Sequence, residues 1–310
     1  MSTRKVAVIG GGVIGASWAA VFAYHGFEVV VQDPDPDIAA KAEWTVEEGH
    51  NVLKQLGPGP ASLNIRFTDD LADAVSGAYA VQENGPERLE LKRSIWSGVE
   101  AAAPRDALLL TSTSGIPAGE ISAALKNPGR LVVGHPFNPP HLLPLVEVVG
   151  SRATTPAQIQ AAVDFYTEVG KKPVVIDQEI SGFVANRLQT ALLREAIYLV
   201  DRGIVTEEAL DDIVTSSIGV RWAVAGPFLS FHLGGGAGGL QHFLEHFGDS
   251  LQQRWETFES PRLNDSLREK LVAQAERSYP VSKIPIFNSE RDVDEINVLN
   301  ALKNRALKQD

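Results

Sequence analysis

Short apolar runs alternate with longer segments of helical period through the first 180 residues of the chain. The runs are rich in valine, isoleucine and leucine, which is typical of buried strands. Eight such strands are expected, over residues 5–9, 28–31, 65–68, 79–82, 108–110, 131–134, 145–149 and 172–176. Because most of them are followed by a helical segment, the pattern predicts an α/β domain with a doubly wound, mostly parallel sheet.

The pattern changes at about Ile180, and no convincing strand follows it. Helices are expected over residues 182–202, 206–217, 240–247, 267–276 and 292–308. Residues 219–231 form a mixed apolar segment, and the glycine-rich run after it predicts a flexible or closely packed loop. We therefore expect two domains, an α/β domain over residues 1–180 and an all-α domain over residues 181–310.

The first expected strand runs into a G-x-G-x-x-G turn formed by Gly10, Gly12 and Gly15, with Val13 and Ile14 inside it. A helix and a second strand follow, and Asp33 closes that strand. This order is typical of a Rossmann-type dinucleotide site, where the glycines bring the backbone and a helix N-terminus to the pyrophosphate. An acid at position 33 would bind the ribose hydroxyls and repel a 2′-phosphate, which favours NAD over NADP. The alternative is a purely structural glycine turn.

Two later runs each carry one titratable residue where an apolar side chain would be easier to bury. His135 closes the strand expected at 131–134, and Glu147 interrupts the strand expected at 145–149, with a proline-rich turn between them. A carboxylate that holds one ring nitrogen of a histidine makes the other nitrogen an oriented general base. The alternative is an edge hairpin with an exposed histidine and an exposed glutamate.

Other polar residues stand where strands of a doubly wound sheet face the ligand crevice. Glu87 and Lys92 follow the fourth expected strand and could touch cofactor or substrate, or could belong to a solvated helix start. The hydroxyl run 111–114 could donate to a substrate oxygen or cap the helix after Pro117. Asn186 is typical of a helix-start residue by its position alone.

Composition narrows the function classes. The chain has 310 residues, a net charge of −11 and no cysteine, which excludes disulfides and thiolate metal sites. The acidic charge argues against nucleic acid or an anionic membrane as partner. No signal-peptide pattern or long apolar run occurs, so a soluble cytoplasmic protein is expected. No metal site is expected either, since His242 and His246 lack a carboxylate at metal-motif spacing.

Taken together, these segments resemble the 3-hydroxyacyl-CoA dehydrogenase family. The matching motifs are VIGGGVIG with Asp33, PERLELK, TSTSG, HPFNPP with LVEVV, GFVANR and GPF. They occur in the family's order from Val6 to about Phe228. The resemblance implies a Rossmann-type NAD domain, a helical domain that forms much of a homodimer interface, and oxidation of a secondary alcohol by hydride transfer to NAD.

The resemblance also implies roles for individual residues. His135 would be the general base, and Glu147 would orient and stabilise its imidazolium. Ser114 and Asn186 would hydrogen-bond the substrate oxygen. Further residues would join the glycine turn and Asp33 in holding NAD, namely Glu87, Lys92 and Asn138.

The segment SIGVRWAVAGPF departs from the enzymes that act on acyl-CoA, and it is similar to a subgroup that acts on free hydroxy acids such as L-gulonate and L-carnitine. We expect Arg221 to grip the carboxylate of a small free L-3-hydroxy acid, unless it only snorkels from an apolar helix end. Alternatives are a CoA-thioester substrate, a related hydroxyacid dehydrogenase with a lysine base, which is disfavoured, and a crystallin-like protein that binds NAD without turnover.

Overall fold

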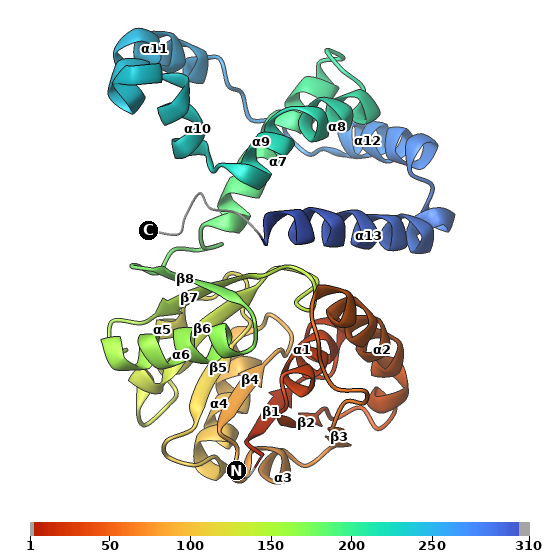
Figure 1. The fold of residues 1–310 in the computed structure, drawn as a ribbon, viewed down its shortest axis with the longest axis vertical. Coiled ribbons are helices and arrows are strands. Elements are labelled where there is room, and N and C mark those ends of the chain that lie inside the picture. The colour runs from red at the N-terminus through yellow and green to blue at the C-terminus, as the bar shows by residue number, and fades with distance from the viewer. Residues whose placement is uncertain (1–2, 304–310) are drawn as a thin grey trace. The chain divides into compact units, whose positions relative to one another are not determined.

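The computed structural model describes residues 3–303 of the chain. It divides into two compact units, residues 1–186 and residues 187–310 (Figure 1). The division falls a few residues after the boundary expected near residue 180. Phe183 explains the difference, because its buried ring packs with Ala118, Val133 and Val149 of the first unit.

The first unit contains an eight-stranded sheet within the described residues, in the order β3-β2-β1-β4-β5-β6-β7-β8. Its strands are β1 (Lys5–Ile9), β2 (Glu28–Gln32), β3 (Ile65–Thr68), β4 (Ala80–Glu83), β5 (Leu108–Thr111), β6 (Leu131–Pro136), β7 (Leu145–Gly150) and β8 (Lys172–Ile176). The first six in chain order pair in parallel, and β7 then turns back antiparallel to β6. This is the doubly wound, mostly parallel sheet that the pattern of apolar runs predicts.

Helices cover both faces of this sheet (Figure 1). The first face is covered by α1 (Val13–Tyr24) and α6 (Pro156–Glu168), with α2 (Ile38–Leu56) packed against α1. The second face is covered by α3 (Leu71–Val75), α4 (Leu89–Ala102) and α5 (Ala118–Ser122). Alternate side chains of β1 enter the two cores, Val6 and Val8 on one face and Ala7 and Ile9 on the other. A strand buried on both faces therefore reads as a continuous apolar run.

Strand β7 is not an edge strand, because β8 pairs with it in parallel. Lys171, the residue before β8, also holds the loop between β6 and β7, because its amino group donates to the carbonyls of Pro140 and Leu143. The alternative of an exposed edge hairpin is therefore wrong.

The second unit contains helices and no strand within its described residues. Its helices are α7 (Ala185–Asp201), which begins in the first unit, α8 (Glu207–Ser216), α9 (Ile218–Val224), α10 (Pro227–Gly234), α11 (Gly239–Glu256), α12 (Asp265–Ser278) and α13 (Ile284–Leu302). Short 3-10 turns lie at Pro128–Arg130, Gly236–Gly238 and Val281–Lys283. Thr206 caps α8 as expected, since its hydroxyl accepts from the Ala209 N–H.

Three expectations for this unit need correction. The mixed segment 219–231 is largely helical, and the glycine-rich run forms the end of α10, a 3-10 turn and the start of α11. The helix expected over 292–308 begins earlier, at Ile284, because Pro285 occupies its first turn, where no intrahelical N–H bond is lost. The positions 304–308 of that expected helix lie outside the described residues.

The helical unit buries few apolar side chains. Within residues 187–303, the buried hydrophobic residues are Val200, Leu267 and Ile296. Large apolar side chains remain exposed, among them Phe228 at 78% and Leu233 at 65%. In residues 3–303, no helix combines the length and apolar character that a membrane span requires.

Candidate active site

His135 and Glu147 form a buried pair between β6 and β7. The antiparallel register sets the two residues directly opposite each other, and the His135 Nδ1 lies 2.8 Å from Glu147 Oε2. Their exposed fractions are only 5% and 2%. The carboxylate therefore fixes the ring through Nδ1 and leaves Nε2 as the nitrogen available for proton transfer.

The second carboxylate oxygen of Glu147 is held by the start of α7. Glu147 Oε1 accepts from the backbone N–H groups of Val184 at 3.0 Å and Ala185 at 2.9 Å. Burial raises the pKa of Glu147, but the bonds from His135 and these two N–H groups outweigh it and lower the pKa below its ordinary value. Glu147 is therefore a carboxylate at neutral pH, and it can stabilise a protonated His135.

Two of the three glycines in the G-x-G-x-x-G turn are required by the fold itself. Gly10 has φ +90°, and a Cβ at Gly15 would lie 1.8 Å from the Gly10 carbonyl oxygen. At Gly12, by contrast, a Cβ would meet no described atom within 4 Å. Packing does not demand glycine at position 12, and the open space there fits a ligand that approaches the backbone.

The same turn is tied to the acid at the end of β2. Asp33 Oδ2 accepts from the Gly11 N–H at 2.8 Å, and Oδ1 accepts from the Asp35 N–H at 3.0 Å. Gly12 stands at the N-cap of α1, where no side chain caps the first turn. Free N–H groups and an oriented carboxylate thus lie side by side, which fits the pyrophosphate and ribose of a dinucleotide.

The hydroxyl run 111–114, which starts at the last residue of β5, does not cap the following helix, because Pro117 is the N-cap of α5. The Thr111, Ser112 and Thr113 hydroxyls bond to Glu83, Asn84 and Glu87 respectively. Ser114 is left with an exposed side chain, and its carbonyl accepts from Asn186 Nδ2 at 3.4 Å.

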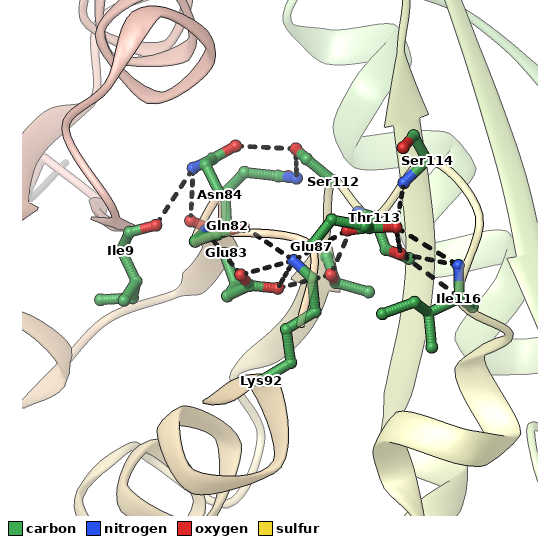
Figure 2. A network of polar contacts seen from close by, with 12 residues as sticks. Ile9, Gln82, Glu83, Asn84, Glu87, Lys92, Ser112, Thr113, Ser114 and Ile116 are labelled. Carbon is green, nitrogen blue, oxygen red and sulfur yellow. Dashed lines mark hydrogen bonds and ion pairs between the residues drawn. The ribbon is translucent and has the colours of Figure 1, made fainter. Parts of the chain in front are cut away.

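Glu87 and Lys92 belong to a polar network at the ends of β4 and β5 (Figure 2). Lys92 is 1% exposed, which excludes a solvated helix start for this residue. Its ammonium contacts both oxygens of buried Glu83, at 2.9 and 3.1 Å, and lies 3.5 Å from Glu87 Oε2. An ion pair therefore links Lys92 to Glu87, and hydrogen bonds link Glu87 to the Ser114 N–H and the Ser114 carbonyl to Asn186.

Within residues 3–303, no side-chain hydrogen bond or ion pair joins Asn138 or Arg221 to this network. Asn138 is an exposed residue of the turn between β6 and β7, and Arg221 is an exposed residue of α9 in the helical unit. Contacts of both residues with cofactor or substrate stay predictions.

Sequence reasoning missed Glu83 and Lys171 altogether. Glu83 is the last residue of β4, one position beyond the strand end expected at Gln82. A charged residue at the carboxyl end of a buried strand is the signal that could have identified it. Thr113 was part of the hydroxyl run, but its partner Glu87 could not be read from the sequence.

Two domains of one known family match most of the chain. The NAD binding domain of 3-hydroxyacyl-CoA dehydrogenase matches residues 5–180, and the C-terminal domain of that family matches residues 182–274. This chain belongs to the 3-hydroxyacyl-CoA dehydrogenase family.

Relatives within the family are similar over nearly their full length. The L-carnitine dehydrogenase of Streptomyces griseus subsp. griseus is 43% identical, with 96% of this chain and 90% of the relative covered. The L-carnitine dehydrogenase of Oceanobacillus iheyensis is also 43% identical, with 88% and 90% covered. A solved structure, the 5-formyl-3-hydroxy-2-methylpyridine 4-carboxylic acid 5-dehydrogenase described as an NAD+ dependent dismutase, has TM-score 0.85 and 32% identity. The alignment with this structure covers 98% of this chain and 100% of the solved chain.

This member of the 3-hydroxyacyl-CoA dehydrogenase family is thus an NAD-dependent oxidoreductase that acts on CH–OH groups. The glycine turn and Asp33 fit NAD, because the space beside Gly12 is open and the Asp33 carboxylate is oriented by the Gly11 N–H.

Proposed function

We propose that this enzyme oxidises the 3-hydroxyl of L-carnitine, a small free L-3-hydroxy acid, to the corresponding 3-keto acid. The observation that carries the proposal is the near-full-length similarity, at 43% identity, to an L-carnitine dehydrogenase. The buried His135–Glu147 pair supports the chemistry, because alcohol oxidation needs a base at the hydroxyl proton.

In this proposal His135 Nε2 takes the hydroxyl proton, and the Glu147 carboxylate stabilises the imidazolium that forms. Ser114 and Asn186 donate hydrogen bonds to the substrate oxygen as it gains alkoxide character. NAD, when bound, supplies the acceptor for the hydride that leaves the same carbon. Loss of the hydroxyl proton and of the hydride together converts the alcohol into the carbonyl, and His135 can return the proton in the reverse direction.

Cofactor binding is assigned to the glycine turn at the start of α1 and to residues near the sheet edge. Beside Gly10, Gly12 and Gly15, the set comprises Val13, Ile14, Asp33, Glu87, Lys92 and Asn138. Arg221 is assigned to the substrate carboxylate, because a guanidinium can bind a carboxylate through two hydrogen bonds.

We also propose that the enzyme is a homodimer formed through its helical domain. The exposed apolar side chains of this unit support the proposal, as does an apolar groove of about 490 Å³ between α7, α8 and α12. The groove is lined by residues such as Leu192, Leu193, Leu210, Val214 and Leu271. Burial of this surface in a dimer would be favourable, and sedimentation of the purified protein tests it. A monomer at micromolar concentration would contradict the proposal.

A substrate panel tests the function. NADH formation is followed with L-carnitine, D-carnitine, L-gulonate, 3-hydroxybutyrate and 3-hydroxybutyryl-CoA, each at the same concentration. We expect the highest kcat/KM for L-carnitine. Highest kcat/KM for the thioester would favour an acyl-CoA dehydrogenase instead. No turnover on the whole panel, together with intact NAD binding, would favour the role of a non-catalytic NAD-binding protein.

A further inference from the structure

Glu83 is a buried acid with every hydrogen-bonding direction used inside the protein. Its Oε1 accepts from the Gly85 N–H at 2.6 Å and from Lys92 at 2.9 Å, and its Oε2 accepts from the Thr111 hydroxyl at 2.6 Å and from Lys92 at 3.1 Å. Glu83 is 0% exposed. A buried ion pair of this kind is stable only when both partners are fully bonded, so it fixes the Lys92 ammonium in one position.

Lys92 is shared with a second acid, Glu87. The ammonium donates to the Gly85 carbonyl at 3.0 Å and lies 3.5 Å from Glu87 Oε2. Figure 2 shows the Lys92 side chain reaching from α4 toward both carboxylates. Because the Lys92 ammonium is held by Glu83, it offers Glu87 Oε2 a fixed positive partner and so helps to orient this carboxylate, which is 39% exposed.

The other oxygen of Glu87 accepts hydrogen bonds from four successive residues, 113–116, of the loop that follows β5. Glu87 Oε1 accepts from the Thr113 hydroxyl at 2.5 Å and from the N–H groups of Ser114, Gly115 and Ile116 at 3.0, 2.9 and 3.3 Å. Thr113 also makes a hydrogen bond within the loop, in which its Oγ1 accepts from the Ile116 N–H at 3.1 Å. Burial raises the pKa of Glu87, but these bonds and the charge of Lys92 outweigh it and lower the pKa.

We propose that Glu83, Lys92 and Thr113 are positioning residues that act through Glu87 to hold Ser114 where it meets the substrate oxygen. This inference deepens the proposed function and depends on it for the role of Ser114. The positioning role is distinct from the binding of NAD that is proposed above for Glu87 and Lys92, and the two roles have different readouts. If they hold NAD, their loss raises the dissociation constant of NAD; if they position Ser114, their loss slows turnover at saturating NAD.

Thr113→Val is the sharpest variant, because it removes one hydroxyl and keeps the shape of a side chain that is 0% exposed. We expect kcat/KM for the hydroxy acid to fall by a factor of about 10 to 100, since one misplaced donor costs up to about 10²–10³. The NAD dissociation constant should change less than twofold. Thr113→Ser retains the hydroxyl and should restore most of the activity. Glu90→Gln is the control, because Glu90 is an exposed acid of α4, the helix that carries Lys92, and this variant should behave as wild type.

A double-mutant cycle with Ser114→Ala separates positioning from general damage. If Thr113 acts through Ser114, Thr113→Val should lower kcat/KM less than twofold further in the Ser114→Ala background. If the double variant instead loses kcat/KM by the product of the two single-variant factors, the two residues act independently and the proposal is overturned. So would a larger effect of Thr113→Val on NAD binding than on turnover.

Hydrogen exchange provides a readout that needs no substrate. The amides of residues 114–116 should exchange at least tenfold faster in Thr113→Val and in the paired variant Glu83→Gln/Lys92→Met, in which no lone buried charge remains. Unchanged protection of these amides would overturn the positioning role, whatever the substrate panel shows. If the wild type oxidises none of the substrates while exchange rises as expected, the proposed function fails and the loop-holding network stands.

Discussion

Glu147 stands directly opposite His135 in the register of β6 and β7, so strand pairing builds the pair that is proposed to be catalytic. Side chains alternate between the faces of a sheet with a period of two. A register shift of one residue would therefore place the two groups on opposite faces and break the 2.8 Å contact between His135 Nδ1 and Glu147 Oε2. The start of α7 locks the same carboxylate from the other side through the Ala185 N–H.

His135→Gln should abolish turnover and spare cofactor binding. Glutamine can still donate to Glu147, so the buried carboxylate keeps a partner, but no base remains. We expect kcat to fall by about 10²–10⁴, with the NAD dissociation constant near that of the wild type when titrated by NADH fluorescence. His50→Gln, whose ring bonds the Pro60 carbonyl in the same unit, is the control. Comparable losses of turnover and NAD affinity would mean that His135 is structural.

Gly12→Ala should separate folding from cofactor binding. Gly12 has φ −62° and ψ −174°, which alanine tolerates, and a Cβ there meets no described atom within 4 Å. The free energy of unfolding without cofactor should stay within about 1 kcal/mol of the wild type in urea, because the lower entropy of the unfolded chain offsets the poorer N-cap. The NAD dissociation constant should rise at least tenfold, which is about 1.4 kcal/mol.

Gly15→Ala is the contrasting variant, since its Cβ would lie 1.8 Å from the Gly10 oxygen. It should lower the free energy of unfolding in the absence of cofactor. Unchanged NAD affinity in Gly12→Ala would show that no ligand approaches this backbone closely.

Asp33→Ser should weaken the discrimination against NADP. The carboxylate is already oriented by the Gly11 N–H at 2.8 Å, and a charge at this position repels a 2′-phosphate. We expect the ratio of kcat/KM for NAD over NADP to fall at least tenfold, mainly through a gain with NADP. If NADP use does not rise, the acid does not meet the ribose.

The sequence predicted the fold because buried strands and the glycine turn leave local signals. Val6 to Ile9 form a continuous apolar run because both faces of β1 are covered. The His135–Glu147 pair was predictable for a similar reason, since titratable residues in valine-rich strands need partners. The segment that became α10, Pro227–Gly234, was not predicted as a helix because its apolar residues lie on every side and leave no periodic stripe.

Other parts of the site depend on contacts between distant segments. Glu83 and Thr111 are 28 positions apart, and Glu87 and Ser114 are 27 apart. Nothing in the local pattern around either acid indicates which loop it holds. The exposed apolar surface of the helical unit is a further example, because helical periodicity predicts an apolar face without naming what covers it.

Arg221→Ala should raise KM for free carboxylate substrates. A bidentate guanidinium–carboxylate pair contributes about 1.5–3 kcal/mol, so we expect KM to rise at least tenfold with little change in kcat. The amide or ester of the same substrate, which carries no carboxylate charge, should be oxidised equally well by wild type and variant. Unchanged KM for every carboxylate substrate would exclude the clamp and leave Arg221 as an exposed residue of α9.

Lys171 should make the stability of the fold depend on pH above neutrality. Its amino group donates to the carbonyls of Pro140 and Leu143 in the loop that joins the His135 and Glu147 strands. Burial lowers the pKa of Lys171 from 10.5 to about 7. Between these two values the unfolded chain binds the additional proton, so the free energy of unfolding rises with pH, and this gain disappears as the pH falls through about 7.

Through this one group, the free energy of unfolding can rise by at most about 1.4 kcal/mol per pH unit. Urea unfolding of the wild type at pH 7, 8 and 9 should show it, and Lys171→Met should have a smaller slope because the titrating amine is gone. Lys172→Met, at the exposed neighbouring position, should keep the wild-type slope. Equal slopes in wild type and Lys171→Met would mean that the amine is protonated in the folded state up to its ordinary pKa, and that the carbonyls of Pro140 and Leu143 solvate its charge.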